Sequence, residues 1–270
     1  MGFPMNRFIS RPLAATIILA ATTLLTQSFA GEAPATEAPP PKPYVMPSKG
    51  IKDYVRAAVE NPARPLSHTI HDAYRKPAEL LDLAGIKPNT KVVELSSYGN
   101  YWSTMLADIV GEKGKLYMYD HMFVEPGGFA AAGKKFAAEH KNTTYEMIDH
   151  NDVEIPKGIN LVWCYACYHE LLLTGTQLTP FQTKLFKAMP PGGIVLIVFF
   201  KARDGTQTDD TGTLHRIDQA IVRAQLQATG FKLESEDIFL QNLDDDRQSP
   251  VFTEAESDLA DKVIFKFRKE

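Results

Sequence analysis

From Lys91 onward the sequence repeats one rhythm: an apolar run of strand length, a turn, and an amphipathic stretch of helix length. This alternation is typical of a mostly parallel β-sheet that carries helices on both faces, so the predicted fold class is α/β. Because no helical pattern separates the last two strands, we expect them to form an antiparallel pair at the sheet edge. The predicted strands are 91–96, 115–120, 143–148, 159–164, 193–200, 231–240 and 262–268. The predicted helices are 76–83, 101–110, 128–141, 180–188 and 214–229.

This architecture also predicts where a ligand binds. In an open α/β sheet, ligands sit beyond the carboxyl ends of the strands, at the switch point beside the first strand. In this sequence those ends carry polar residues, at 94–99, 120–121, 149–150 and 164–170. We therefore expect the functional site along this edge of the sheet.

The first thirty residues have the pattern of an export signal. Arg7 and Arg11 precede an uncharged stretch whose apolar part, 13–25, has the length of a signal-peptide core. Ser28 and Ala30 supply the small residues that a signal peptidase reads, so cleavage is predicted after Ala30. The alternative is an uncleaved anchor helix, but the apolar part is shorter than the roughly 20 residues that span a bilayer.

Residues 31–49 contain six prolines and are predicted to be an extended linker, with the folded domain over 50–270. Removal of residues 1–30 leaves 27 Lys and Arg against 33 Asp and Glu, a net charge of −6. This balance lacks the basic excess that binding to a phosphate backbone needs, so no nucleic-acid partner is expected. No stable membrane insertion is expected after cleavage either.

Glu94 lies in the first predicted strand, and Asp120 and Asp149 close the second and third. A turn with a single glycine, 96–100, follows the first strand. Together with several motifs, this order of elements resembles that of exported methyltransferases of the class I, Rossmann-like family, which use S-adenosylmethionine. The resemblance extends from Asp72 to the C-terminus, and its most specific motif is His-Arg-Ile-Asp at 215–218. The other motifs are 72–79, Tyr101-Trp102, 168–170, 244–247 and 266–269.

The resemblance implies a Rossmann-like, seven-stranded, mostly parallel sheet and S-adenosylmethionine as cofactor. In the family the turn after the first strand is glycine-rich, because the backbone approaches the carboxylate end of the cofactor. Asp120 is placed to accept hydrogen bonds from the ribose hydroxyls, and the alternative is that it only caps the next turn. The residues implied to bind the cofactor are Glu94, Ser96, Gly99, Tyr101, Asp120 and Asp149.

Three residues are candidates for catalysis: His169, His215 and Asp218. His169 follows the fourth strand, where this fold presents the methyl acceptor, and the resemblance places His215 and Asp218 opposite that loop. Three residues apart on one helix, His215 and Asp218 would share a face, so Asp218 would fix the tautomer of His215. Arg216 would then meet an anionic group of the substrate. The alternative is a structural hydrogen-bond pair at the start of the helix.

Cys164 and Cys167 are the two cysteines of the chain, and they lie at the end of the fourth strand. In an extended strand, residues i and i+3 lie about 10 Å apart, so a disulfide requires the chain to turn there. No helix is predicted directly after them and no second ligand pair is present. A disulfide or two buried thiols is therefore favoured over a metal or redox site, and no metal site is predicted.

Two functions are consistent with these features. The first is an exported, periplasmic enzyme that transfers a methyl group from S-adenosylmethionine to a small molecule. The second is a non-catalytic protein that keeps the fold and binds another small ligand in the same place. Affinity for S-adenosylmethionine separates the two.

Overall fold

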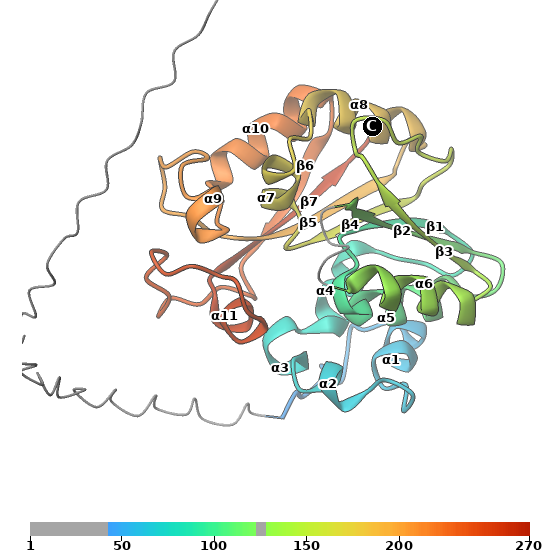
Figure 1. Cartoon of the computed structure of the whole chain (residues 1–270). Coiled ribbons are helices and arrows are strands. Elements are labelled where there is room, and N and C mark those ends of the chain that lie inside the picture. The colour runs from blue at the N-terminus through green and yellow to red at the C-terminus, as the bar shows by residue number, and fades with distance from the viewer. Residues whose placement is uncertain (1–42, 123–127) are drawn as a thin grey trace, which may run out of the picture. The chain divides into compact units, whose positions relative to one another are not determined.

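Seven strands form one sheet in the computed structural model, which describes residues 43–122 and 128–270 (Figure 1). The strand order is β3-β2-β1-β4-β5-β7-β6; β1 to β5 run parallel, and β7 is antiparallel to both of its neighbours. The predicted α/β class and the antiparallel pair at the edge are therefore confirmed. The strands are β1 (Lys91–Leu95), β2 (Lys115–His121), β3 (Thr143–Ile148), β4 (Leu161–Tyr165), β5 (Ile194–Phe200), β6 (Lys232–Asp237) and β7 (Lys262–Arg268).

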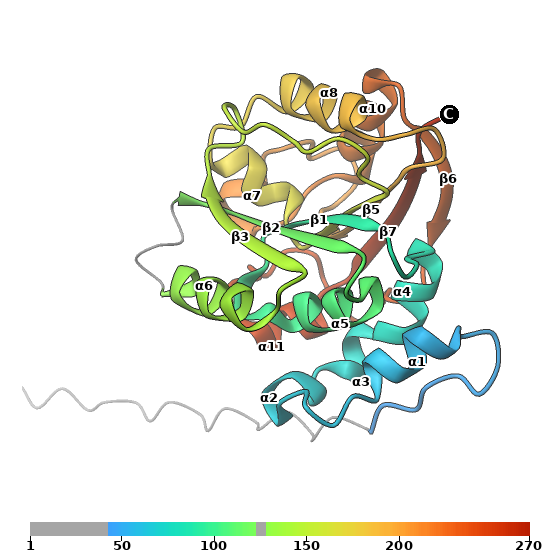
Figure 2. The same ribbon diagram turned by 90° about the vertical axis from the view of Figure 1, so that its right-hand side faces the viewer.

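Helices cover both faces of this sheet (Figures 1 and 2). One face carries α4 (Pro77–Ala84), α5 (Tyr101–Val110) and α6 (Phe129–Glu139), and the other carries α7 (Tyr168–Leu173), α8 (Leu178–Ala188) and α10 (Gln219–Thr229). The remaining helical segments are α1 (Asp53–Val59), α2 (Leu66–Thr69), α3 (Asp72–Arg75), the short η1 (Tyr98–Asn100), α9 (Thr211–Leu214) and α11 (Glu254–Leu259).

The sheet separates two hydrophobic cores. Successive side chains of a strand point to opposite faces, so neighbouring residues of one strand belong to different cores. On β5, Leu196 packs with α4 and α5 residues, whereas Ile197 packs with residues of α7, α8 and α10. Burial on both sides explains why β4 and β5 read as continuous apolar runs in the sequence.

The structure corrects three predictions about helices. The helix predicted over 214–229 is broken, because His215 takes a left-handed backbone and Asp218 caps a new helix through the N–H of Ala220. A helix, α11, lies between β6 and β7, and a capping box of Thr253 and Glu256 begins it. The third correction is α7, a helix that begins directly after Cys167, where none was predicted.

The predicted signal peptide and most of the predicted linker lie outside the described residues. Residues 43–49 form neither helix nor strand, and Tyr44 and Met46 pack, partly buried, against the core on the α4 side. Tyr44 also donates a hydrogen bond to Glu79 at 2.5 Å. In the described part of the chain, every helix is too short or too polar to cross a bilayer.

Candidate functional site

A pocket of about 510 Å³ opens where β1, β4 and β5 end, within the size range of small-molecule sites. Its walls come from the turn after β1, the first residues of α5, the ends of β4 and β5, α7, the residue after α9, and the segment 251–257. The sequence predicted a site at this edge of the sheet, beside the first strand. The pocket lies there, next to the switch point between β1 and β4.

The backbone around the pocket is held in uncommon conformations. Three non-glycine residues that line it have positive φ: Ser96 (60°), Ala166 (53°) and His215 (55°). Such residues are a few per cent of non-glycine positions, and backbone of this kind persists only where the surrounding structure holds it. They lie directly after β1, β4 and α9, so each turns the chain at the rim of the pocket.

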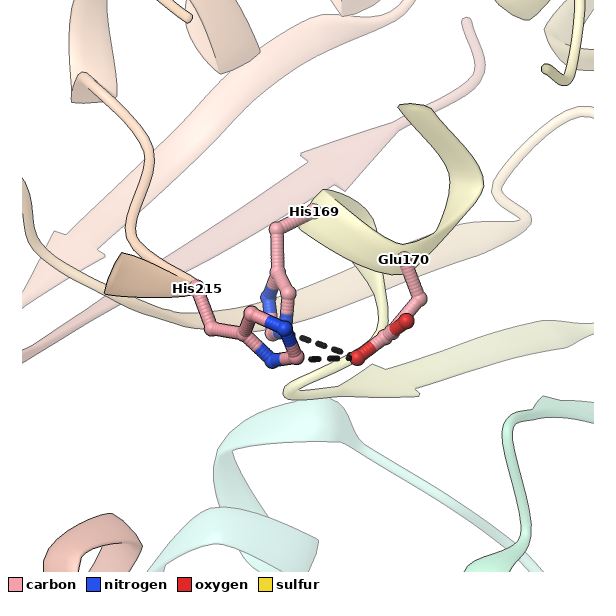
Figure 3. Close-up of side chains that lie close together, drawn as sticks. All are labelled: His169, Glu170 and His215. Atoms are coloured by element: carbon pink, nitrogen blue, oxygen red, sulfur yellow. Dashed lines mark ion pairs between the residues drawn. The ribbon is translucent and has the colours of Figure 1, made fainter. Parts of the chain in front are cut away.

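Three side chains converge on one wall of this pocket: His169 and Glu170 from the start of α7, and His215 from the end of α9 (Figure 3). Glu170 Oε1 lies 3.2 Å from His169 Nε2 and 3.4 Å from His215 Nδ1. The His169 side chain is 2% exposed, that of Glu170 15% and that of His215 24%. The resemblance placed His215 opposite the loop that carries His169, and the structure brings the two side chains together.

The charges within this cluster shift the pKa values of two of its members. Burial alone would raise the pKa of Glu170, but its contact with His169 and the charges of both histidines lower that pKa overall. Burial lowers the pKa of His215, His169 lowers it further, and Glu170 opposes the shift. A carboxylate and a neutral imidazole therefore face the pocket at neutral pH.

The start of α7 is fixed by a disulfide between Cys164 and Cys167. Ala166, in its left-handed conformation, turns the chain so that the two Cα atoms lie 5.3 Å apart, well below the separation in an extended strand. Of the two states left open from the sequence, the disulfide is the one formed. It anchors His169 and Glu170 to the end of β4.

The chain after His215 is also held firmly, but by residues to which the sequence assigned other roles. Arg216 is buried and makes a two-pronged ion pair with Asp245, at 2.7 and 3.0 Å, so it does not reach a substrate in the pocket. Asp218 is buried, accepts hydrogen bonds from the backbone of Gly205 and Ala220, and is not part of the pocket. The predicted pairing of Asp218 with His215 on one helix face is corrected, because a helix boundary separates them.

Three of the residues implied to bind a cofactor line the pocket: Ser96, Gly99 and Tyr101. The hydroxyl of Tyr101 donates a hydrogen bond to Asp72 at 2.6 Å, and its ring lies under the guanidinium group of Arg75. Tyr101 therefore joins α3 to α5 and offers the pocket its ring.

The other three residues implied to bind the cofactor are acids, and they do not line the pocket. Asp120 is buried and accepts hydrogen bonds from the backbone and side chain of Ser97 and from Tyr145. Glu94 is buried and accepts a hydrogen bond from Ser103, and Asp149 caps its own turn through the N–H of Asn151. Their assigned roles in cofactor binding stay predictions.

Sequence reasoning missed the aromatic character of the pocket and its wall from the segment 251–257. The rings of Tyr98, Trp102, Tyr165 and Phe200 line it. Because strand-end aromatics look the same in a core and at a site, only their place at the carboxyl ends of β4 and β5 was a signal. No spacing in the sequence linked 251–257 to the pocket.

No family model and no curated protein matches the chain in sequence. Solved structures do resemble its fold. A methyltransferase from Aquifex aeolicus that depends on S-adenosylmethionine superposes with a TM-score of 0.51 at 15% identity, covering 70% of this chain and 87% of that one. Geranyl diphosphate methyltransferase, solved with S-adenosylmethionine, gives 0.50 at 12% identity, covering 82% and 97%.

The (4+2)-cyclase SpnF also matches, with a TM-score of 0.54 at 13% identity, covering 78% of this chain and 85% of the cyclase. Methyltransferases and a cyclase therefore share this architecture, and fold alone does not assign the reaction. The expected strand architecture is nevertheless confirmed by the superpositions. The chain has the Rossmann-like fold of the class I methyltransferases that depend on S-adenosylmethionine.

Proposed function

We propose that this protein transfers a methyl group from S-adenosylmethionine to a small molecule bound in the pocket. The observation that carries the proposal is the position of the pocket. It joins the turn after β1, where the fold family binds its cofactor, to the polar cluster of His169, Glu170 and His215. A small acceptor fits the pocket volume, and the net charge argues against a nucleic-acid substrate.

The residues of the turn fit the amino-acid end of this cofactor. Ser96 and Asn100 both hold left-handed backbone, with φ of 60° and 61°, which is the conformation that glycines supply in such turns. The backbone of this turn therefore keeps the shape that close approach of a ligand requires, and Ser96 and Gly99 would hold the carboxylate end. S-adenosylmethionine, when bound, supplies an electrophilic methyl group.

The chain itself would orient the acceptor and hold its proton. Rings of Trp102, Tyr165 and Phe200 form an apolar wall against which an acceptor would pack. The polar cluster of His169, Glu170 and His215 is positioned to bind an acceptor hydroxyl or amine and to assist the loss of its proton. Such positioning and proton removal are the main tasks of a protein that catalyses an in-line methyl transfer.

A second candidate is a binding protein that keeps the fold without the reaction. Two observations favour it. Ser97 and Tyr145 already donate hydrogen bonds to the carboxylate of Asp120, and the ring of Tyr98 lines the pocket at the turn. Both reduce the room and the acceptors available to a nucleoside. This candidate retains the pocket for a ligand of different chemistry.

Calorimetric titration with S-adenosylmethionine and S-adenosylhomocysteine separates the candidates. Methyl transfer requires that the cofactor binds, with an expected Kd of about 1 μM, or about −8 kcal/mol, and Gly99→Val should weaken this binding. Tyr98→Ala, which removes the ring at the turn, is the comparison variant. If wild type gives no heat at millimolar ligand and Tyr98→Ala binds, the tyrosine blocks the cofactor and the second candidate is correct; if neither binds, methyl transfer is excluded.

We further propose that the protein is exported to the periplasm. The disulfide supports this, because disulfides persist in oxidising compartments and are rare in the cytosol. The test is to express the full chain in a bacterium and to sequence the N-terminus of the recovered protein. A chain beginning at Gly31 in the periplasmic fraction is expected, and an intact N-terminus in the cytosol would contradict export.

A further inference from the structure

The cluster of His169, Glu170 and His215 has the donor set of a metal centre, with one candidate ligand atom from each side chain and all three atoms within 4.8 Å of one another. Two imidazoles and one carboxylate are the protein ligands of one class of catalytic zinc site, in which a fourth position stays open. We propose that these three residues bind a divalent transition metal, with Zn²⁺ as the preferred ion.

Two of the three separations between the donor atoms match those expected around a bound metal ion. Ligands about 2.1 Å from a tetrahedral zinc ion lie about 3.4 Å from each other. The separations of 3.2 Å and 3.4 Å from Glu170 Oε1 to the two histidine nitrogens match that distance. The 3.4 Å separation is longer than an ordinary N–H···O hydrogen bond, and the 3.2 Å separation is at the long end of that range.

The same structure provides an internal comparison. His71 also lies between two carboxylates, and there the ring nitrogens approach Asp258 and Glu254 to 2.5 and 2.6 Å. Those are hydrogen-bond lengths, so His71 is a cross-link between α3 and α11. The separations around Glu170 are wider than those around His71 (Figure 3).

The donors are held on anchored elements, as a metal site requires. His169 and Glu170 follow the disulfide, and His215 precedes Arg216, which Asp245 fixes in the interior. All three donors line the pocket, so a fourth ligand would come from a molecule bound there. The class of ligand implied is one with an oxygen or nitrogen donor, such as a hydroxyl, carboxylate or amine.

The test uses purified, tag-free protein, stripped with chelator and titrated with Co²⁺ and then Zn²⁺. We expect one Co²⁺ per chain with visible absorption typical of a tetrahedral ion, displaced by one Zn²⁺. Glu170→Gln and His215→Gln should each weaken Zn²⁺ binding by more than the roughly 10- to 100-fold that loss of an outer hydrogen-bond partner costs. His140→Gln, which removes a histidine far from the cluster in the sequence, should bind as wild type does.

Circular dichroism of the metal-free variants checks that each is folded. If one variant is unfolded, the Zn²⁺ affinity of the other tests the proposal. Absence of stoichiometric Co²⁺ binding by wild type would overturn the proposal. So would equal Zn²⁺ affinity in wild type and in the folded Glu170 or His215 variants. Because the readout is metal binding alone, the outcome is independent of whether S-adenosylmethionine binds.

Discussion

At the scale of single residues, Glu94 shows how burial changes a role assigned from position. Its carboxyl group is buried within the sheet, where Ser103 donates a hydrogen bond to it at 2.7 Å. Burial, opposed by the hydrogen bond from Ser103 and assisted by the neighbouring charge of Asp120, raises the pKa of Glu94 to about 8. The carboxyl group is therefore largely protonated in the folded protein at neutral pH.

This shift predicts a pH-dependent effect of Glu94→Gln. The folded pKa is above the unfolded value of about 4.3, so the contribution of Glu94 to stability is full below that value and is lost as pH rises to about 8. The amide keeps an acceptor for Ser103 but carries no charge. We expect the variant to gain stability over wild type at pH 8, by up to about 1.4 kcal/mol per pK unit between the two values.

Urea unfolding of both proteins at pH 8 and at pH 4.5 measures this difference. The gain should disappear at pH 4.5, where wild-type Glu94 is protonated in the folded state. An equal difference at both pH values would show that the side chain is charged in the folded protein.

Asp218 allows a second test at this scale, because the structure gives it a capping role. Asp218→Ala removes the cap of α10 and an acceptor for the backbone of Gly205, so we expect a loss of about 1–2 kcal/mol in the free energy of unfolding. Asp218→Asn should keep much of that stability. Normal stability with lost ligand binding would instead restore the catalytic role predicted from the sequence.

At the scale of elements, the disulfide links the end of β4 to the start of α7. Closing a loop of this length stabilises a protein by roughly 2 kcal/mol in the chain-entropy model. The Cys164→Ser, Cys167→Ser double variant should lose about that amount, and wild type in reductant should unfold at the same urea concentration as the variant. Reductant should not affect the variant; if wild type is also unaffected, the bond is not formed in the native protein.

Contact between α6 and β3 depends on a glycine. A Cβ atom added at Gly133 would lie 2.2 Å from the ring of Tyr145, whose hydroxyl group bonds to Asp120. We expect Gly133→Ala to destabilise the protein by about 1–3 kcal/mol, measured by urea unfolding. Gly212→Ala, where the nearest atom is 3.7 Å away, is the control and should be nearly neutral.

A double variant identifies the cause. Adding Tyr145→Leu to Gly133→Ala removes the ring that the new methyl group meets, so part of the lost stability should return. A double variant with the full sum of both losses would mean that the clash is not between these two side chains.

At the scale of the whole molecule, the sheet divides two cores that should nevertheless unfold together. Leu196 and Ile197 are neighbours on β5 but belong to different cores, and both tryptophans, Trp102 and Trp163, lie in the core of Leu196. We expect Leu196→Ala and Ile197→Ala each to cost about 2–5 kcal/mol and to shift fluorescence and circular dichroism transitions equally. If Ile197→Ala shifts only the dichroism transition, the cores unfold separately.

The sequence predicted this architecture well because two-sided burial leaves a simple signature. Every strand lies within two residues of its predicted start, and the carboxyl edge of the sheet was identified as the site. Parallel strands buried on both faces require apolar runs, and helices between them require amphipathic ones, so the local pattern and the global topology agree.

The details of the site were less predictable because they depend on side-chain contacts between distant segments. A helical pattern continues across His215, and only the cap at Asp218 and the buried Arg216 show that the chain breaks there. Likewise, Ser97 and Asp120 are 23 residues apart, and their hydrogen bonds are not encoded in any local pattern. Periodicity predicts elements, whereas such contacts decide which polar groups stay available to a ligand.

The left-handed backbone of the turn after β1 decides which substitutions would suit it. Ser96 and Asn100 hold conformations that glycine adopts freely and that disfavour a typical side chain by about 1–2 kcal/mol. Substituting glycine at either position would relieve strain without reshaping the loop. Two substitutions, at Ser96 and Asn100, would therefore turn this loop into one with three glycines.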